Sequence, residues 1–277
     1  MRFASIGSGS QGNGTLIDNG GKGAILLDCG FSARETRNRL AMKSLDIANL
    51  AGILVTHEHG DHAKGVAVLA NTHRLPVYCT WGTYQAALSG RLDDALFHRI
   101  DPVSVFELAG CRIEAVAVPH DAREPCQYVI SAEQQRLGIL SDVGSFTRDL
   151  IVAYQGCDAL MLECNHDLHM LAQGPYPAQL KRRVAGHYGH LNNQQAAEFL
   201  RQVAHPKLQH LIATHISQKN NTPELALEAL AQAEVDLSFS VQVATQAVGF
   251  DWIEMTPSIP RVQNSTAERQ LILDLEI

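Results

Sequence analysis

The stretch THEHGDHAKG at 56–65 constrains the fold of this chain more than any other. Its three histidines and two acidic residues directly follow an apolar run that predicts a buried β-strand. Imidazole nitrogens and carboxylate oxygens are suitable ligands for Zn²⁺, Mn²⁺ or Fe²⁺. The spacing allows two adjacent metal sites, with His57 and His59 directed at one ion and Asp61 and His62 at the other. A polar turn with incidental histidines is the alternative for this stretch taken alone.

Four side chains are too few to hold two metal ions, so the rest of the chain must supply more ligands. Three further candidates each follow a strand-like apolar run: His120 ends VAVPH, Asp142 ends GILSD, and His215 ends LIATH. A structural residue held by hydrogen bonds is the better explanation for any one of them alone. Together with the cluster after residue 56, they predict a two-metal site.

Composition and targeting signals narrow the class of protein. The 277 residues suffice for one large domain or two modest ones, and 45% hydrophobic with 18% charged residues is typical of a soluble globular chain. No apolar run approaches the roughly 18–20 residues that span a bilayer, and the N-terminus lacks a signal-peptide pattern. The six cysteines are scattered without a C-x-x-C pair, which favours buried free thiols. We therefore expect a cytoplasmic protein without a membrane partner.

The net charge of −7 argues against a broad basic surface for nucleic acid. Two bound divalent cations would bring the charge to about −3, and they would act where a phosphate binds. The sequence also contains a local basic run, Lys181-Arg182-Arg183.

Apolar runs and helix signals alternate through both halves of the chain. Strands are predicted over 2–6, 24–28, 52–56, 76–79, 111–118, 126–131, 136–142, 159–163, 210–215, 238–244 and 247–255, with 126–131 and 136–142 forming a hairpin. The predicted N-caps are Ser32, Asn193 and Thr222. The first and third open helices to about 42 and about 233, and the second opens a helix with Ala197, Leu200 and Ala204 on one face. This order predicts an α/β fold over residues 1–256, with two sheets and helices outside. Residues 257–277 form a C-terminal tail or an added strand.

The pattern H-x-H-x-D-H, followed by His120, Asp142 and His215, resembles the metallo-β-lactamase fold superfamily. The resemblance implies an αββα sandwich of two mixed β-sheets flanked by helices, with the site at one edge between the sheets. The implied ligands are His57, His59 and His120 for one ion and Asp61, His62 and His215 for the other, with Asp142 bridging both. Asp28 matches an aspartate that orients the metal-binding loop, although a loop-capping role is the alternative.

Residues between Asp142 and His215 indicate a branch of this superfamily. Glu163, Gly189-His190, Gln195-Ala196-Ala197 and Thr214-His215-Ile216-Ser217 resemble the phosphodiesterase branch that includes tRNase Z. The resemblance implies that Glu163 supports His190, which donates a proton to the leaving oxygen. The alternatives are an exposed loop histidine and a strand-end glutamate. Lactamases of the best-known class place cysteine where Asp142 stands, which argues against lactam cleavage.

Over residues 1–255 the chain resembles the compact YycJ/WalJ subgroup, whose members are described as 5′→3′ DNA exonucleases or unassigned hydrolases. The matching segments are GSGSQGNGT (7–15), PHDA (119–122), ECNHD (163–167) and YPAQLKRRV (176–184). The resemblance places Lys181, Arg182 and Arg183 near the mouth of the site, where cations could hold phosphates; a solvated helix face is the alternative. Asn165 and His166 could line the site or make structural hydrogen bonds. The segment 7–15 is better explained as a tight turn between strands than as an anion-binding loop.

These features predict a hydrolase that uses two divalent ions, Zn²⁺ or Mn²⁺ with Fe²⁺ possible, to cleave phosphodiester bonds. The expected activity is that of a 5′→3′ exonuclease or another nuclease on DNA or RNA. Asp61 would orient the attacking water-derived nucleophile, and His190 with Glu163 would supply the proton. One alternative is a hydrolase of a small substrate, such as a cyclic phosphodiester or a thioester. Another is a non-catalytic regulatory metal-binding protein. The sequence does not decide between a monomer and a homodimer.

Overall fold

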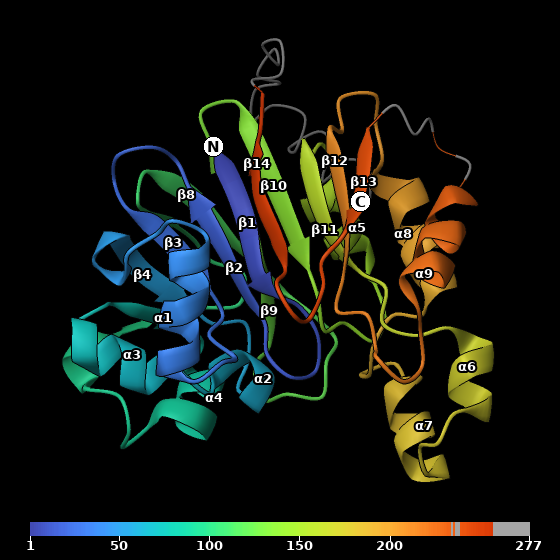
Figure 1. Ribbon diagram of the computed structural model, residues 1–277, viewed down its shortest axis with the longest axis horizontal. Coiled ribbons are helices and arrows are strands. Elements are labelled where there is room, and N and C mark those ends of the chain that lie inside the picture. The colour runs from blue at the N-terminus through green and yellow to red at the C-terminus, as the bar shows by residue number, and fades with distance from the viewer. Residues whose placement is uncertain (234, 236–238, 257–277) are drawn as a thin grey trace, which may run out of the picture.

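The computed structural model describes residues 1–233, 235 and 239–256 (Figure 1). The predicted tail or added strand over 257–277 lies outside the described residues. Within them, two seven-stranded mixed sheets stand face to face with helices on both outer sides, which confirms the predicted αββα sandwich.

The first sheet has the strand order β14-β1-β2-β3-β4-β5-β6. Its strands are antiparallel from β14 to β3 and parallel from β3 to β6. The strands are β1 (Arg2–Gly7), β2 (Gly14–Asp18), β3 (Ala24–Leu27), β4 (Leu50–Leu54), β5 (Val77–Cys79), β6 (Phe97–Arg99) and β14 (Phe250–Glu254).

The second sheet has the order β13-β12-β11-β10-β9-β8-β7. Strands β10 to β13 run parallel, and β7 to β10 form an antiparallel meander. The strands are β7 (Val105–Leu108), β8 (Cys111–Ala117), β9 (Cys126–Ala132), β10 (Gln135–Leu140), β11 (Ala159–Glu163), β12 (His210–Thr214) and β13 (Ser240–Val243). The predicted hairpin is confirmed, because β9 and β10 pair from Ala132 with Gln135.

Three hydrophobic clusters account for the layers. Strand β3 shows how they arise: Leu26 packs towards the helices on one side, whereas Ile25 and Leu27 join the core between the two sheets. Because both faces of such a strand are covered, its sequence is a continuous apolar run rather than an alternating one. Helices α1 (Ala33–Met42) and α3 (Val66–His73) cover the first sheet, and α5 (Arg148–Tyr154), α8 (Asn193–Val203) and α9 (Pro223–Ala231) cover the second.

Shorter elements lie across the lower part of the molecule in Figure 1, from its centre to its right side. They include α2 (Gly60–Ala63), α4 (Trp81–Thr83), α6 (Leu168–Gln173) and α7 (Ala178–Val184). Three further short helices, η1 (Ile47–Asn49), η2 (Tyr84–Leu88) and η3 (Asp94–Leu96), complete the connections. Among the residues that the structure describes, no helix has both the length and the apolar character needed to cross a bilayer.

Two local predictions differ from the structure in detail. Strand β4 ends at Leu54, two residues before the predicted end, so the histidine cluster lies in a loop and in α2. The predicted N-cap Asn193 is wrong by one residue: Asn192 caps α8, because its side chain and that of Gln195 form a reciprocal capping box. Asn193 is instead the first helical residue, and its side chain bonds to Asn221. The six cysteines are buried and free, as predicted.

Candidate metal centre

The candidate ligands meet at one edge of the sandwich, because both sheets end their central strands there. The carboxyl ends of parallel strands share an edge of a sheet, so residues that follow different strands come together. The residues concerned are Asp28 after β3, His57 to His62 after β4, His120 after β8, Asp142 after β10, Glu163 at the end of β11 and His215 after β12.

Three of these residues turn the backbone sharply as the chain leaves its strand. Asp28, Asp142 and His215 have φ angles of 61°, 53° and 50°, in the left-handed region that few residues other than glycine adopt. Such a conformation costs about 1–3 kcal/mol and persists where the surrounding structure enforces it. All three are buried, so their side chains are held within the site rather than in solvent.

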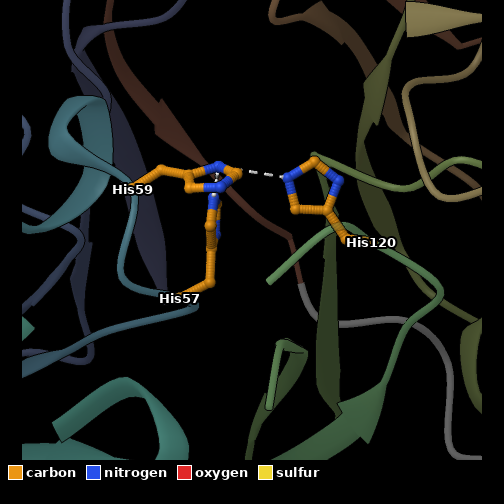
Figure 2. A group of neighbouring side chains, drawn as sticks. All are labelled: His57, His59 and His120. Atoms are coloured by element: carbon orange, nitrogen blue, oxygen red, sulfur yellow. Dashed lines mark hydrogen bonds between the residues drawn. The ribbon is translucent and has the colours of Figure 1, made fainter. Parts of the chain in front are cut away.

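The first group of ligands consists of His57, His59 and His120, whose nitrogens converge (Figure 2). His59 Nδ1 lies 3.0 Å from His57 Nε2 and 3.3 Å from His120 Nε2. The outer nitrogen of His120 donates to the carbonyl of Gly189 at 3.0 Å, and that of His57 lies 2.9 Å from Thr56 Oγ1.

Burial lowers the pKa of both His57 and His120, so these rings are neutral at neutral pH. Because His120 carries its proton on Nδ1, its Nε2 presents a lone pair to the other two rings. Nitrogen lone pairs at such separations repel unless a proton or a metal ion lies between them, and one proton on His59 Nδ1 can face only one of its two neighbours. The donor set therefore fits a divalent metal ion.

The second group is centred on Asp142. Its Oδ2 lies 3.0 Å from His62 Nε2 and 2.8 Å from His215 Nδ1, while its Oδ1 lies 4.0 Å from His120 Nε2. Asp61 Oδ2 lies 3.7 Å from His62 Nε2 and 3.9 Å from His215 Nε2. Although burial alone raises the pKa of Asp142, His215 and His62 hold it well below its usual range. An ionised carboxylate thus lies between the two groups.

Asp28 holds His62 from outside the cluster. Its Oδ2 accepts from His62 Nδ1 at 2.8 Å, and its Oδ1 accepts from the main-chain N–H of Thr56 at 2.9 Å. A ring nitrogen tied to a carboxylate fixes the tautomer and leaves Nε2 free to bind metal. Among the described residues, neither Asp28 nor Asp61 belongs to the groups of side chains whose ligand atoms all converge, whereas Glu163 and His190 form one such group with Asp142 and His215.

Glu163 and His190 form a pair beside this cluster. The Glu163 side chain is fully buried, and its Oε1 accepts from His190 Nδ1 at 2.8 Å. Its Oε2 accepts from the N–H groups of Val143 and Leu191 at 3.1 and 3.2 Å. Although burial alone lowers it, the Glu163 carboxylate raises the pKa of His190 to about 9. His190 is thus held in place, with 22% of its side chain exposed to the cavity.

A cavity of about 150 Å³ adjoins the candidate ligands and the Glu163–His190 pair. It is lined by Ser10, His59, Asp61, Asp121, Asp142, Asn165, Tyr176, Leu180, Arg183, Val184, Gly189, His190, His215 and Ser217. The cavity thus contains both the acidic and imidazole groups of the centre and several residues of the segment around α7.

The five residues predicted to contact substrate occupy different environments in the structure. Asn165 and Arg183 line the cavity, and Arg183 pairs with the Asp121 carboxylate on the loop after His120. Lys181 donates instead to the carbonyl of Ala172 at 2.6 Å. Arg182 is exposed and is not among the lining residues. His166 is fully buried, and within the described part of the chain its ring nitrogens have no hydrogen-bond partner.

Sequence reasoning missed Asn13 and Ser141, which contact the centre. Asn13 Nδ2 lies 3.0 Å from His62 Nε2 and 3.2 Å from the carbonyl of Asp61. Ser141 Oγ lies 3.1 Å from His215 Nδ1. Asn13 follows a glycine within the segment 7–15. The glycines and the asparagine of this segment indicate a turn, but they do not indicate which residues the turn contacts. The adjoining Gly9 and Gly12 pack against the side chains of Gln246 and Phe31, which supports a packed turn.

Residues 24–216 match the family model described as the beta-lactamase superfamily domain. The chain belongs to this superfamily. It is 33% identical over 264 residues to exodeoxyribonuclease YycJ of Bacillus anthracis, with 94% of this chain and 97% of that protein covered. It is 29% identical over 251 residues to exodeoxyribonuclease WalJ of Streptococcus pneumoniae, with 88% and 93% covered.

Two solved structures show the same fold as this member of the superfamily. The metallo-beta-lactamase fold protein YhfI from Bacillus subtilis superposes with a TM-score of 0.70 at 16% identity, covering 91% of this chain and 99% of that one. The short form of human tRNase Z superposes with a TM-score of 0.64 at 18% identity, covering 92% and 100%.

Proposed function

We propose that this protein is a metal-dependent exodeoxyribonuclease, which hydrolyses phosphodiester bonds at DNA ends. The observation that carries the proposal is the Glu163–His190 pair, with 2.8 Å between Oε1 and Nδ1, beside a converging set of imidazole and carboxylate ligands. A phosphodiester of an alcohol expels a poor leaving group, so its cleavage gains from a positioned acid. The names of the YycJ and WalJ relatives support DNA as the substrate.

The two ligand groups would hold two divalent ions. His57, His59 and His120 would bind one and Asp61, His62 and His215 the other, with Asp142 shared between them. Bound there, the ions would activate water and neutralise charge on the phosphate oxygens. We propose Zn²⁺ or Mn²⁺, with Fe²⁺ compatible, because nitrogen and carboxylate ligands accept all three.

Side chains of the protein supply the remaining chemistry. The carboxylate of Asp61 lines the cavity and can accept a hydrogen bond from the attacking water, which orients it. His190 is fixed through Nδ1 by Glu163, so its other nitrogen is available to donate a proton to the departing oxygen. Asp28 keeps the ring of His62 in one tautomer throughout.

The test is an assay of purified protein, supplied with Mn²⁺ or Zn²⁺, on single- and double-stranded oligonucleotides labelled at the 5′ or the 3′ end. We expect metal-dependent shortening from the 5′ end. A cyclic nucleotide and a thioester serve as parallel substrates. Turnover of only these small substrates would replace the proposal with a small-substrate hydrolase, and no turnover of any substrate would favour a non-catalytic metal-binding protein.

A further inference from the structure

Helix α7 (Ala178–Val184) lies over the metal centre without burying any of its side chains. Leu180 and Val184 are four residues apart and so share one face of this helix. Among the described residues, neither belongs to any of the three hydrophobic clusters that form the core. Both instead line the cavity. The apolar face of α7 therefore contributes to the site rather than to the core.

Polar contacts, not apolar packing, hold this segment in place. Arg183 pairs with Asp121, Lys181 donates to a main-chain carbonyl at the end of α6, and the Val184 carbonyl accepts from the N–H of His190 at 2.9 Å. These contacts hold the C-terminal half of α7 against three neighbouring segments.

Tyr176, just before α7, lines the same cavity. The Nζ atom of Lys219 lies 5.7 Å from the centre of its ring, within the range of a cation–π contact. Lys219 belongs to the segment after β12, which also carries the candidate ligand His215. The segment after β12 therefore contacts the ring of Tyr176 through Lys219.

The walls of the cavity differ in chemistry. The side formed by His59, Asp61, Asp142, His190 and His215 is polar and contains the candidate metal ligands, and Arg183 adds a cation at the rim. The segment around α7 adds Tyr176, Leu180 and Val184 to the lining, beside smaller polar contributions from other segments. A nucleotide has the complementary layout, with an anionic phosphate joined to a flat apolar base.

We propose that Tyr176, Leu180 and Val184 form a subsite for the base next to the scissile phosphate. This inference rests on the proposed function and specifies its substrate as a diester that carries a nucleoside. Bases of all kinds stack on aromatic rings, because each has a π-face. Since Leu180 and Val184 offer no side-chain donors or acceptors, the subsite accepts any base but disfavours an abasic residue.

The test compares the variants Tyr176→Ala and Tyr176→Phe with Tyr188→Ala as the matched control. Tyr188 is an aromatic residue on the same segment, but it is 65% exposed and does not line the cavity. The substrates are p-nitrophenyl phosphate diesters of thymidine, esterified at O5′ or at O3′, and methyl p-nitrophenyl phosphate. All three share one leaving group, and the methyl ester lacks the nucleoside that both thymidine esters carry.

We expect Tyr176→Ala to raise KM for at least one thymidine ester about fivefold or more relative to the methyl ester, as loss of one base stack predicts. Tyr176→Phe should retain most of the preference, and Tyr188→Ala should retain all of it. Equal effects of Tyr176→Ala on thymidine and methyl esters would overturn the inference.

A binding measurement separates this inference from the proposed function. Fluorescence anisotropy of a labelled single strand, with intact bases or with abasic residues at its 5′ end, needs no turnover. Wild-type protein should bind the intact strand more tightly, and Tyr176→Ala should reduce that difference. If the wild type shortened no oligonucleotide, the proposed function would fail, whereas equal binding of the two strands by the wild type would overturn the subsite.

Discussion

Replacement of Glu163 by glutamine tests the proposed proton donor most directly. The Glu163 carboxylate accepts three hydrogen bonds, from His190 Nδ1 at 2.8 Å and from the N–H groups of Val143 and Leu191 at 3.1 and 3.2 Å. Glutamine has one carbonyl oxygen, so its NH₂ group must face at least one of these donors. Loss of a hydrogen bond to a charged group costs about 1.5–3 kcal/mol, which corresponds to roughly a 10- to 150-fold loss of rate if it falls on the transition state.

The effect should depend on the leaving group. We expect Glu163→Gln to lower kcat by about this factor on oligonucleotides, and His190→Ala by about 10²- to 10⁴-fold, the usual contribution of an acid catalyst. Hydrolysis of bis(p-nitrophenyl) phosphate should change little, because p-nitrophenolate departs without a proton. The double variant should be no slower than His190→Ala, since the two residues act as a unit.

Thermal unfolding and metal content by elemental analysis serve as controls, because Glu163 is fully buried and its replacement can loosen the fold. Variants that retain metal and structure isolate the chemical step. Equal losses on oligonucleotide and p-nitrophenyl substrates would refute the reasoning, and so would fully additive losses in the double variant.

Four further substitutions, one of them a control, probe the rest of the site. Asp142→Ala should lose bound metal, because its carboxylate lies between the two ligand groups; two ions per chain by elemental analysis would contradict this. Arg183→Ala should lower the affinity for DNA and reduce the slope of log affinity against log salt concentration by about one. Lys181→Ala should change neither, because the Lys181 ammonium already donates to a main-chain carbonyl. Equal slopes of the two variants in salt titrations would argue against this distinction. Asp28→Ala should lower the free energy of unfolding by about 1–3 kcal/mol and weaken metal binding about 10- to 100-fold, because His62 Nδ1 loses its hydrogen-bond acceptor. Unchanged urea unfolding and unchanged metal titration would show that this bond is dispensable.

Most central strands could be predicted because both of their faces are covered, but the central strand β2 was missed. Strand β3, for instance, is apolar throughout, and Asp28 marks its end by a change of residue type. Two of the edge strands, β6 and β7, were not predicted. Strand β6 spans three residues, two of them exposed, and β7 alternates exposed with less exposed positions, so neither yields a distinct apolar run.

The candidate ligands could be proposed from spacing and from their positions after strands, but their supporting contacts could not. Asn13 contacts His62 across 49 positions of sequence, a proximity that exists only once the strands are paired. Helix α7 was equally difficult to predict from the sequence. It has only seven residues, and its apolar residues Leu180 and Val184 line a cavity rather than join the core. The basic run at its end suggested three equivalent cations, yet only Arg183 among them lines the cavity.

The pairing of β14 with β1 has a consequence for the order in which the chain can mature. Strand β1 lies between β2 and β14, so the first described strand waits for the last described strand before its second edge is covered. Until then, the open edge of Arg2–Gly7 can pair with other chains. The segment that follows β1 carries Ser8, whose hydroxyl accepts from the N–H of His215. Completion of the active centre and closure of the first sheet are thus late events of synthesis, which delays hydrolytic competence until nearly the whole domain has been made.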